Sequence, residues 1–136
     1  MKISPIYINC GISGFESPAS DLADMDLSLD DLLIKNKNST FFGVASGNSM
    51  RGAGIDTGDI LIIDRNVDVK DLSVVVVNLN GEFTCKILDK KNKRLLSASK
   101  DYPPVMITEA DVFQLEGSVV ASVRRYDDPL KLSEFM

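Results

Sequence analysis

The residues of this chain that could support covalent chemistry are a serine and a lysine. Ser49 lies in the pentapeptide Ser46–Met50, and Lys86 closes the strand-like run Glu82–Lys86. The chain contains no histidine, so a serine nucleophile would have no imidazole to remove its proton. A neutral lysine could take that role. Because free lysine has a pKa of about 10.4, desolvation would have to lower this pKa by several units for the amine to act as a base near neutrality.

Two features of the local sequence favour such a pair. Lys86 stands between the apolar residues Cys85 and Ile87 in a run typical of a strand, and a rigid strand can hold a catalytic group accurately. Because side chains alternate along a strand, Lys86 should point away from the face that carries Cys85 and Ile87. Ser49 follows Gly47 at the end of another strand-length run, where a tight backbone can present a hydroxyl together with backbone N–H groups.

The composition limits the classes of function. With 136 residues, 44% of them apolar, the chain is long enough for one domain with an arm. A net charge of −5 without a concentrated basic stripe argues against direct DNA binding. Cys10 and Cys85 are too few for a disulfide scaffold and lack the spacing of a zinc site, so we expect neither a metal nor a cofactor. The chain shows no signal peptide and no apolar run of about 18–20 residues, which indicates a cytoplasmic protein outside the membrane.

Short apolar runs separated by turns predict a mainly β domain from Phe41 onward. The clearest element is a hairpin, because Asn80-Gly81 joins two β-rich runs and both residue types tolerate the positive φ of a type I′ turn. We expect strands over residues 41–45, 60–63, 74–79, 82–88, 95–96, 105–107 and 112–123.

The N-terminal part of the chain has a different character. A short extended segment is expected over residues 3–8, followed by a connector rich in Gly, Ser and Pro over residues 10–20. The apolar residues of 27–34, with Ser28 as a possible cap, suggest a short helix or turn. We therefore divide the chain into an N-terminal arm (1–38) that carries the cleavage region discussed below, a β core domain (39–126) and a C-terminal tail (127–136).

Three blocks of sequence, in the same order, resemble the LexA/UmuD-like self-cleaving peptidases, and most closely the UmuD-like branch. These blocks are Gly47–Met50, Gly54–Asp64 and Gly81–Lys86. The 37 positions from Ser49 to Lys86 agree with the spacing in the family. Gly14–Ala19 also resembles the segment that follows the family's cleavage point, so the resemblance spans residues 14–125, most of the chain.

The resemblance implies a fold, a chemistry and a set of partners. The fold would be a LexA/signal-peptidase-like β domain of short antiparallel strands with a flexible N-terminal arm. Ser49 would be the nucleophile, Lys86 the general base, and the backbone N–H groups of Ser49 and Met50 the oxyanion hole. The substrate would be the protein's own arm, cut when a RecA–single-stranded DNA filament stimulates the reaction. The shortened product would be a homodimer and an accessory subunit of a UmuC-like Y-family DNA polymerase in SOS translesion synthesis.

Two bonds in the arm are candidates for cleavage. The family favours Ala-Gly or Cys-Gly pairs, which points to the bond between Cys10 and Gly11. Counting back without gaps from Ser17-Pro18-Ala19 instead points to the bond between Ser13 and Gly14. Small residues at either site would let the backbone approach a nucleophile closely, and we prefer the Cys10–Gly11 bond. Only nine residues precede Cys10, too few for the helix-turn-helix domain of LexA-type repressors, so operator binding is not expected.

Two other functions remain open from the sequence. A signal-peptidase-type protease acting in trans would use the same serine–lysine chemistry in a related β fold. A non-catalytic partner-binding dimer, such as a repressor antagonist or a polymerase accessory factor, would need no chemistry at Ser49. The arm with its candidate bonds favours a self-cleaving precursor, and the lack of an anchor or export signal disfavours the signal-peptidase alternative.

Overall fold

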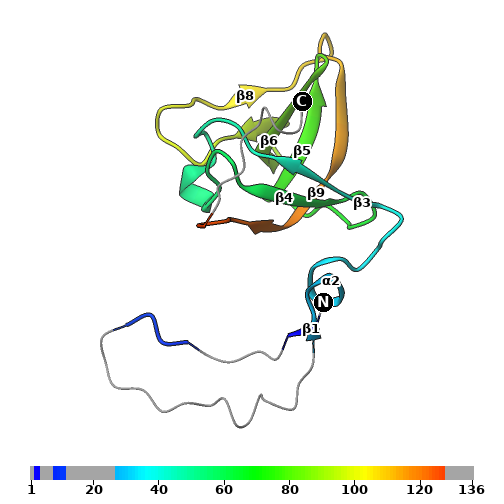
Figure 1. Cartoon of the computed structure of the whole chain (residues 1–136). Helices are drawn as coiled ribbons and strands as arrows, with labels where there is room; N and C mark the ends of the chain where they lie inside the picture. The colour runs from blue at the N-terminus through cyan, green and yellow to red at the C-terminus, as the bar shows by residue number, and fades with distance from the viewer. Residues whose placement is uncertain (1, 4–7, 12–26, 128–136) are drawn as a thin grey trace. The chain divides into compact units, whose positions relative to one another are not determined.

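In the computed structural model, which describes residues 2–3, 8–11 and 27–127, the chain divides into two units, Met1–Lys35 and Asn36–Met136 (Figure 1). No helix within the described ranges is long and apolar enough to cross a membrane. The connector beyond Gly11, the tail beyond Asp127 and most of the expected 3–8 segment lie outside the described residues. The boundaries at residues 38 and 126 therefore remain a proposal.

The first unit contains a small antiparallel pairing and a short helix. β1 (Lys2–Ile3) pairs with β2 (Leu27–Ser28), and α2 (Leu29–Leu33) follows immediately. The short helix expected over residues 27–34 is thus confirmed. Ser28 occupies its N-cap position, but the serine side chain makes no capping hydrogen bond.

The second unit is built on one antiparallel sheet, so the prediction of a mainly β fold is confirmed. The strands follow one another in the sheet in the order β3-β4-β9-β5-β6-β7-β8, and every neighbouring pair is antiparallel. Each expected strand is present with bounds that differ by at most one residue. The strands are β3 (Thr40–Val44), β4 (Ile60–Asp64), β5 (Ser73–Leu79), β6 (Glu82–Asp89), β7 (Arg94–Leu96), β8 (Val105–Met106) and β9 (Phe113–Val123), with a short 3₁₀ helix, η1 (Arg51–Ala53), between β3 and β4.

The β5–β6 hairpin forms as its turn residues predict. Asn80 and Gly81 have φ angles of 54° and 88°, the left-handed values that a type I′ turn requires at both central positions. The turn sets the register of the pair, in which Val75 lies opposite Lys86. Seven consecutive residue pairs then hold Lys86 in the interior of β6.

The long strand β9 joins two groups of strands. Its first part pairs with β5 and its second part with β4 (Figure 1). The register shifts between Ile62 and Ile63 in β4, and again between Val76 and Val77 in β5, which marks β-bulges. Because bulges bend and twist a sheet, β3 and β4 can pack over the face of β6 that carries Cys85.

Two apolar clusters form the core on the two faces of β5. One cluster consists of the buried residues Met50, Ile55, Leu61, Ile63 and Val76, with Cys85 and Ile87 packed against it. The other consists of Val75, Val77, Leu88 and Leu95. A strand covered on both faces has an uninterrupted apolar run, which explains the four consecutive valines of β5. The Lys86 side chain lies on the opposite face of β6 from Cys85 and Ile87, as the alternation predicts.

Gly117 of β9, which pairs with Val76 beside one of these register shifts, makes a tight contact that tests this architecture. A Cβ atom added at Gly117 would lie 2.7 Å from Ile63 Cγ2 and 2.9 Å from the Asp64 carbonyl oxygen, and the latter is backbone that cannot move aside easily. We expect Gly117→Ala to lower the free energy of unfolding by about 1–3 kcal/mol. Gly43→Ala is the matched control, because its new Cβ would meet only Ile63 Cδ1, at 3.9 Å. Urea denaturation measures both, and equal stability of the two variants would contradict the packing described.

Candidate active site

The structure brings Ser49 and Lys86 together. Lys86 reaches from β6 toward the loop before η1, and its Nζ lies 2.8 Å from Ser49 Oγ. The same Nζ lies 2.9 Å from the hydroxyl oxygen of Ser97, which directly follows β7. The ring of Tyr102 lies on a third side, with its centroid 5.4 Å from the amine. One lysine therefore contacts two hydroxyl groups and an aromatic ring.

The surroundings of Lys86 favour its neutral form. Burial lowers the pKa of the Lys86 amine below its ordinary value, and the neighbouring thiol of Cys85 opposes this only in part. No carboxylate in the described part of the chain forms a salt bridge with this lysine. A partly buried amine without an anionic partner releases its proton more readily than a free one. The distance to Ser49 and the direction of the pKa shift are those that a general base requires.

The loop that carries Ser49 is tied to the segment after β7. The Ala98 N–H donates to the Ser49 carbonyl oxygen at 2.8 Å, and the Gly52 N–H donates to the Ala98 carbonyl oxygen at 2.7 Å. These two backbone hydrogen bonds hold the loop against the residue that follows Ser97. Since Ser49 and Ser97 belong to the two connected segments, their hydroxyls are fixed relative to each other.

A second set of bonds ties the same loop to the turn before β4. The Gly47 N–H donates to Thr57 Oγ1 at 2.9 Å, and the Thr57 hydroxyl donates to the Gly47 carbonyl oxygen, also at 2.9 Å. The Gly58 N–H donates to the Ala45 carbonyl oxygen at 2.9 Å. The position of the Ser49 hydroxyl thus depends on the shape of this turn.

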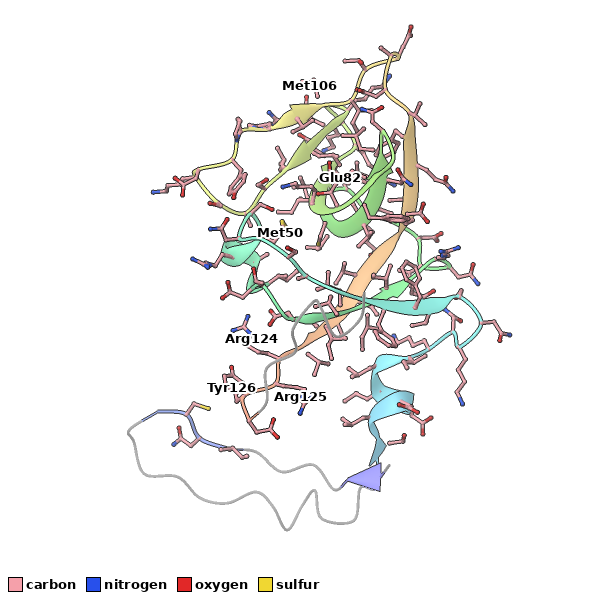
Figure 2. All side chains as sticks on the ribbon, turned by 45° about the horizontal axis from the view of Figure 1, so that its top comes forward. Met50, Glu82, Met106, Arg124, Arg125 and Tyr126 are labelled. Atoms are coloured by element: carbon pink, nitrogen blue, oxygen red, sulfur yellow. The ribbon has the colours of Figure 1, made fainter. Side chains whose placement is uncertain are left out.

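An ion pair between Arg124 and Asp59 stabilises this turn. The Asp59 side chain is only 3% exposed and accepts two 2.7 Å hydrogen bonds from Arg124, which immediately follows β9 (Figure 2). Arg124 also donates to the Gly54 carbonyl oxygen at 3.1 Å, and the Asp56 N–H donates to Asp59 at 2.8 Å. The hydrogen bonds from Arg124 are the main reason that the pKa of Asp59 lies below its ordinary value. The end of β9 therefore supports the loop that holds Ser49.

The backbone beside Ser49 offers hydrogen-bond donors. Within the described residues, neither the Ser49 N–H nor the Met50 N–H donates to a protein acceptor. The Met50 side chain is 4% exposed and anchors this backbone in the core. Two anchored N–H groups beside a hydroxyl have the chemistry of an oxyanion hole, but that role remains a proposal.

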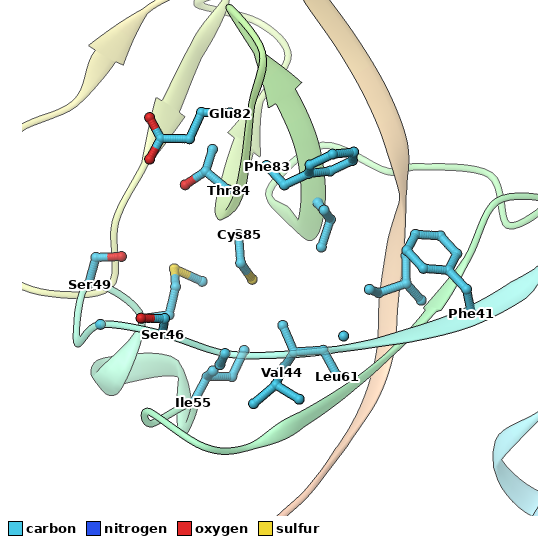
Figure 3. A pocket seen from close by; sticks show the side chains of 16 residues that line it. Phe41, Val44, Ser46, Ser49, Ile55, Leu61, Glu82, Phe83, Thr84 and Cys85 are labelled. Atoms are coloured by element: carbon cyan, nitrogen blue, oxygen red, sulfur yellow. The ribbon is translucent and has the colours of Figure 1, made fainter. Parts of the chain in front are cut away.

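A cavity of about 450 Å³ leads to Ser49. Figure 3 shows Ser49 near one end of it and Phe41 near the other. β3 and the Ser49 loop form one wall, residues 82–85 of β6 form the other, and core residues such as Leu61 form an apolar floor. Its volume and its apolar floor are compatible with a site for a short peptide segment.

Both walls of this cavity belong to strands with unpaired edges. Among the described residues β3 pairs only with β4, and β7 pairs with β6 only over Ile87–Asp89. Residues 82–86 of β6 therefore have no strand partner on the side away from β5. Exposed strand edges can bind an extended peptide through main-chain hydrogen bonds while its alternate side chains enter a pocket.

Only one of the two candidate cleavage bonds lies within the described residues. Cys10 and Gly11 are exposed in the first unit, and the Gly11 N–H donates to Asn9 Oδ1 at 2.7 Å. Ser13 and Gly14 lie outside the described residues. The choice between the two bonds thus remains a proposal.

Sequence reasoning missed Ser97 and Arg124. The β6–β7 register contains the signal for Ser97: Ile87 lies opposite Leu96, so the next position along each strand places Lys86 beside Ser97. No comparable local signal identifies Arg124, because 65 positions separate it from Asp59. Cys85 packs against the core, and burial raises the pKa of its thiol to about 11, so it is not a competing nucleophile.

Comparison with known proteins places the chain in a family. The family described as "Peptidase S24-like" matches residues 5–120. The chain is 36% identical to Protein ImpA of Salmonella typhimurium over 101 residues, which cover 74% of this chain and 70% of that protein. It is 30% identical to Protein SamA of Salmonella typhimurium strain LT2 over 125 residues, 91% of this chain and 89% of that protein. It is 39% identical to the LexA repressor of Bordetella pertussis over 80 residues, 57% of this chain and 37% of that protein.

The ion pair that supports the Ser49 loop predicts an effect on stability. Arg124→Gln leaves Asp59 buried without a cation, so we expect a melting temperature several degrees below wild type at pH 7. Because folding lowers the Asp59 pKa, its stabilising contribution is complete above the ordinary value of 3.8 and is lost as the pH falls through the folded value. The deficit of Arg124→Gln should therefore shrink below about pH 3.8.

Arg51→Gln serves as the matched control. It removes an ion pair with Asp56 whose arginine side chain is 64% exposed, and exposed pairs contribute little to stability. Thermal melts followed by circular dichroism across pH measure both variants. Equal losses for Arg51→Gln and Arg124→Gln at pH 7 would show that the Asp59 pair does not support the loop.

Proposed function

The chain belongs to the Peptidase S24-like family, in its LexA/UmuD group, and we propose that it is a serine endopeptidase that cuts its own N-terminal arm. One observation carries the proposal: in a chain without histidine, Lys86 Nζ lies 2.8 Å from Ser49 Oγ in surroundings that lower the lysine pKa. A serine nucleophile needs a base within hydrogen-bond reach; Lys86 lies within that distance, and the lowering of its pKa favours the neutral form that a base needs.

The reaction follows from the groups around Ser49. Neutral Lys86 accepts the hydroxyl proton while Ser49 Oγ attacks the carbonyl carbon of the scissile bond. The N–H groups of Ser49 and Met50 donate to the oxyanion that forms on the carbonyl oxygen. The Lys86 ammonium then protonates the leaving nitrogen, and the peptide C–N bond breaks to leave an ester on Ser49. Water, deprotonated by Lys86, hydrolyses this ester and restores the free hydroxyl.

The arm would enter the cavity as an extended strand. Alternation then places the residue before the cut bond and the residue two positions earlier on the same side, toward the apolar floor. Cleavage between Cys10 and Gly11 places Cys10 and Ile8 there, whereas cleavage between Ser13 and Gly14 places Ser13 and Gly11 there. An apolar floor binds Cys10 and Ile8 better, which supports the Cys10–Gly11 bond.

The cellular role that fits this reaction is that of a UmuD-like protein in SOS mutagenesis. A RecA–single-stranded DNA filament would stimulate cleavage by favouring the docked arm. The shortened chain would form a homodimer and serve a UmuC-like Y-family DNA polymerase as an accessory subunit in translesion synthesis. The likeness to ImpA, SamA and LexA supports this role, and the exposed ring of Phe42 on the edge strand β3 would suit a surface between two copies.

The proposal predicts base-dependent self-cleavage. Purified protein should lose its first ten residues, and the rate should rise with pH, because only the neutral Lys86 acts as a base and neutral amine accumulates as the pH approaches and passes its lowered pKa. Ser49→Ala and Lys86→Ala should each slow cleavage roughly a thousandfold or more. Mass spectrometry over a series of pH values measures both effects.

Controls come from residues of the same type nearby. Ser99→Ala, which alters a serine outside the cavity lining, and Lys93→Ala, which alters an exposed lysine, should leave the rate within a few-fold of wild type. An unchanged mass at every pH, with or without a RecA filament, would refute the peptidase proposal and favour a partner-binding dimer. Cleavage of an exported precursor but not of the arm would favour the trans-acting protease.

Docking of Ile8 predicts a difference between two variants of the arm. Ile8→Asp would bring a charge to the apolar floor, so cleavage should slow about tenfold or more, while Ile12→Asp should have a smaller effect. The mass of the product identifies the bond in the same experiment. Loss of thirteen residues would move the cut to the Ser13–Gly14 bond, and an effect of Ile12→Asp equal to or larger than that of Ile8→Asp would contradict the docking of Ile8 on the apolar floor.

A further inference from the structure

The amine of Lys86 has one more partner than the proposed reaction uses. It lies 2.8 Å from Ser49 Oγ and 2.9 Å from Ser97 Oγ. A neutral amine has a single lone pair and two N–H bonds, and it rotates freely about its Cε–Nζ bond unless something stops it. Proton transfer from Ser49 requires that the lone pair, and not an N–H bond, points at the serine hydroxyl.

We propose that Ser97 is a positioning residue: its hydroxyl oxygen accepts an N–H of Lys86 and so turns the lone pair of the amine toward Ser49. The proposal rests on the function proposed above, in which Lys86 is the base. Ser97 itself neither attacks the substrate nor carries its proton. It acts only through the orientation of the lysine.

The backbone holds Ser97 where this role requires it. Leu96, the residue before it, pairs with Ile87 of β6, the residue after Lys86. Ala98, the residue after it, is bound through its N–H and its carbonyl oxygen to the loop of Ser49. Ser97 is thus fixed on one side to the strand of the base and on the other side to the loop of the nucleophile.

The neutrality of Ser97 matters as much as its position. A carboxylate at this distance would stabilise the ammonium form and keep the base protonated, whereas a hydroxyl accepts the same hydrogen bond without adding charge. Burial can therefore lower the pKa of Lys86 while the amine still has an acceptor. A group that orients the amine without stabilising its protonated form must therefore be an uncharged acceptor, such as a hydroxyl or a carbonyl.

Few charged groups face this amine. Cys85 on its own strand and the Tyr102 ring on the loop after β7 are its titratable neighbours. The Tyr102 hydroxyl donates to Asn48 Oδ1 at 2.6 Å, which links the ring to the loop of Ser49. Of the other charged side chains on the packed segments, Arg51 pairs with Asp56 and the buried Asp89 pairs with Arg94, while Glu82, Lys100 and Asp101 are exposed. A change of charge at position 97 would therefore act directly on Lys86.

The test compares three substitutions at Ser97 by the pH profile of self-cleavage. Ser97→Ala removes the acceptor, so we expect a rate about tenfold to a hundredfold lower at every pH, with a midpoint that does not rise. Ser97→Thr keeps the hydroxyl and should restore most of the rate. Ser97→Asp supplies a carboxylate and should move the midpoint upward by about one pH unit or more. Ser99→Ala is the control, because Ser99 accepts a hydrogen bond from the Asp101 N–H and not from Lys86.

A second readout does not depend on the arm. A fluorophosphonate phosphonylates an activated serine with loss of fluoride, so its rate of attachment to Ser49, followed by mass, reports the nucleophilicity of that hydroxyl. The Ser97 variants should show the same order and the same shift in this reaction. If wild type labels at Ser49 but never cuts its arm, the proposed function fails while the role of Ser97 stands or falls by the labelling rates.

Two results would contradict the positioning role of Ser97. The first is that folded Ser97→Ala is cleaved and labelled at the wild-type rate, and the second is that the pH profile of folded Ser97→Asp keeps the wild-type midpoint. Either result would show that Ser97 does not position the base. Circular dichroism establishes that each variant is folded. If Ser97→Ala does not fold, the comparison of Ser97→Thr with Ser97→Asp decides, because a purely structural role would not shift the pH midpoint in the direction of the added charge. Failure of Ser49 to label at any pH would overturn both proposals.

Discussion

The rest of the structure serves one interaction, the short contact between the partly buried amine of Lys86 and the hydroxyl of Ser49. Bringing an amine into a low-dielectric site without an anion is unfavourable for its charged form. In most settings that penalty would be a defect, but here it lowers the lysine pKa in the direction that a base requires. The lack of an anionic partner for Lys86 in the described part of the chain reduces the contribution of this contact to stability, but it favours the neutral amine that proton transfer requires.

Each large feature of the second unit helps to hold this contact. The hairpin at Asn80-Gly81 sets the register of β6 and so the position of Lys86. The bulged strand β9 lets β3 and β4 pack against the same core as β6, and Arg124 at its end binds the turn beneath the Ser49 loop. Ser49, in the loop after β3, and Lys86, in β6, are thus held by different parts of one bent sheet, and the distance between them depends on how that sheet folds over its core.

The same bend leaves a cavity between β3 and β6 whose walls have unpaired strand edges. Unpaired edges invite strand addition, which proteins usually prevent by covering or shortening such edges. Under the proposed function, the arm would pair with these edges, because a segment tethered to the domain has a high effective concentration. The family membership, the unpaired strand edges and the arm are therefore consistent with the proposed self-cleavage.

Local patterns were sufficient to predict the strands, the Asn80-Gly81 turn and the opposite faces of Lys86 and Cys85, because alternation and turn chemistry act over a few residues. The blocks around Ser49 and Lys86 likewise identified the candidate pair and the family. Only the tertiary structure decided that Ser97 would complete the surroundings of the amine, and that Arg124 would anchor a turn 65 positions away. The Ser97 contact depends on the register of β6 and β7, and the Arg124 contact depends on a sheet curvature that arises from packing over the whole core and leaves no signal in any short stretch of sequence.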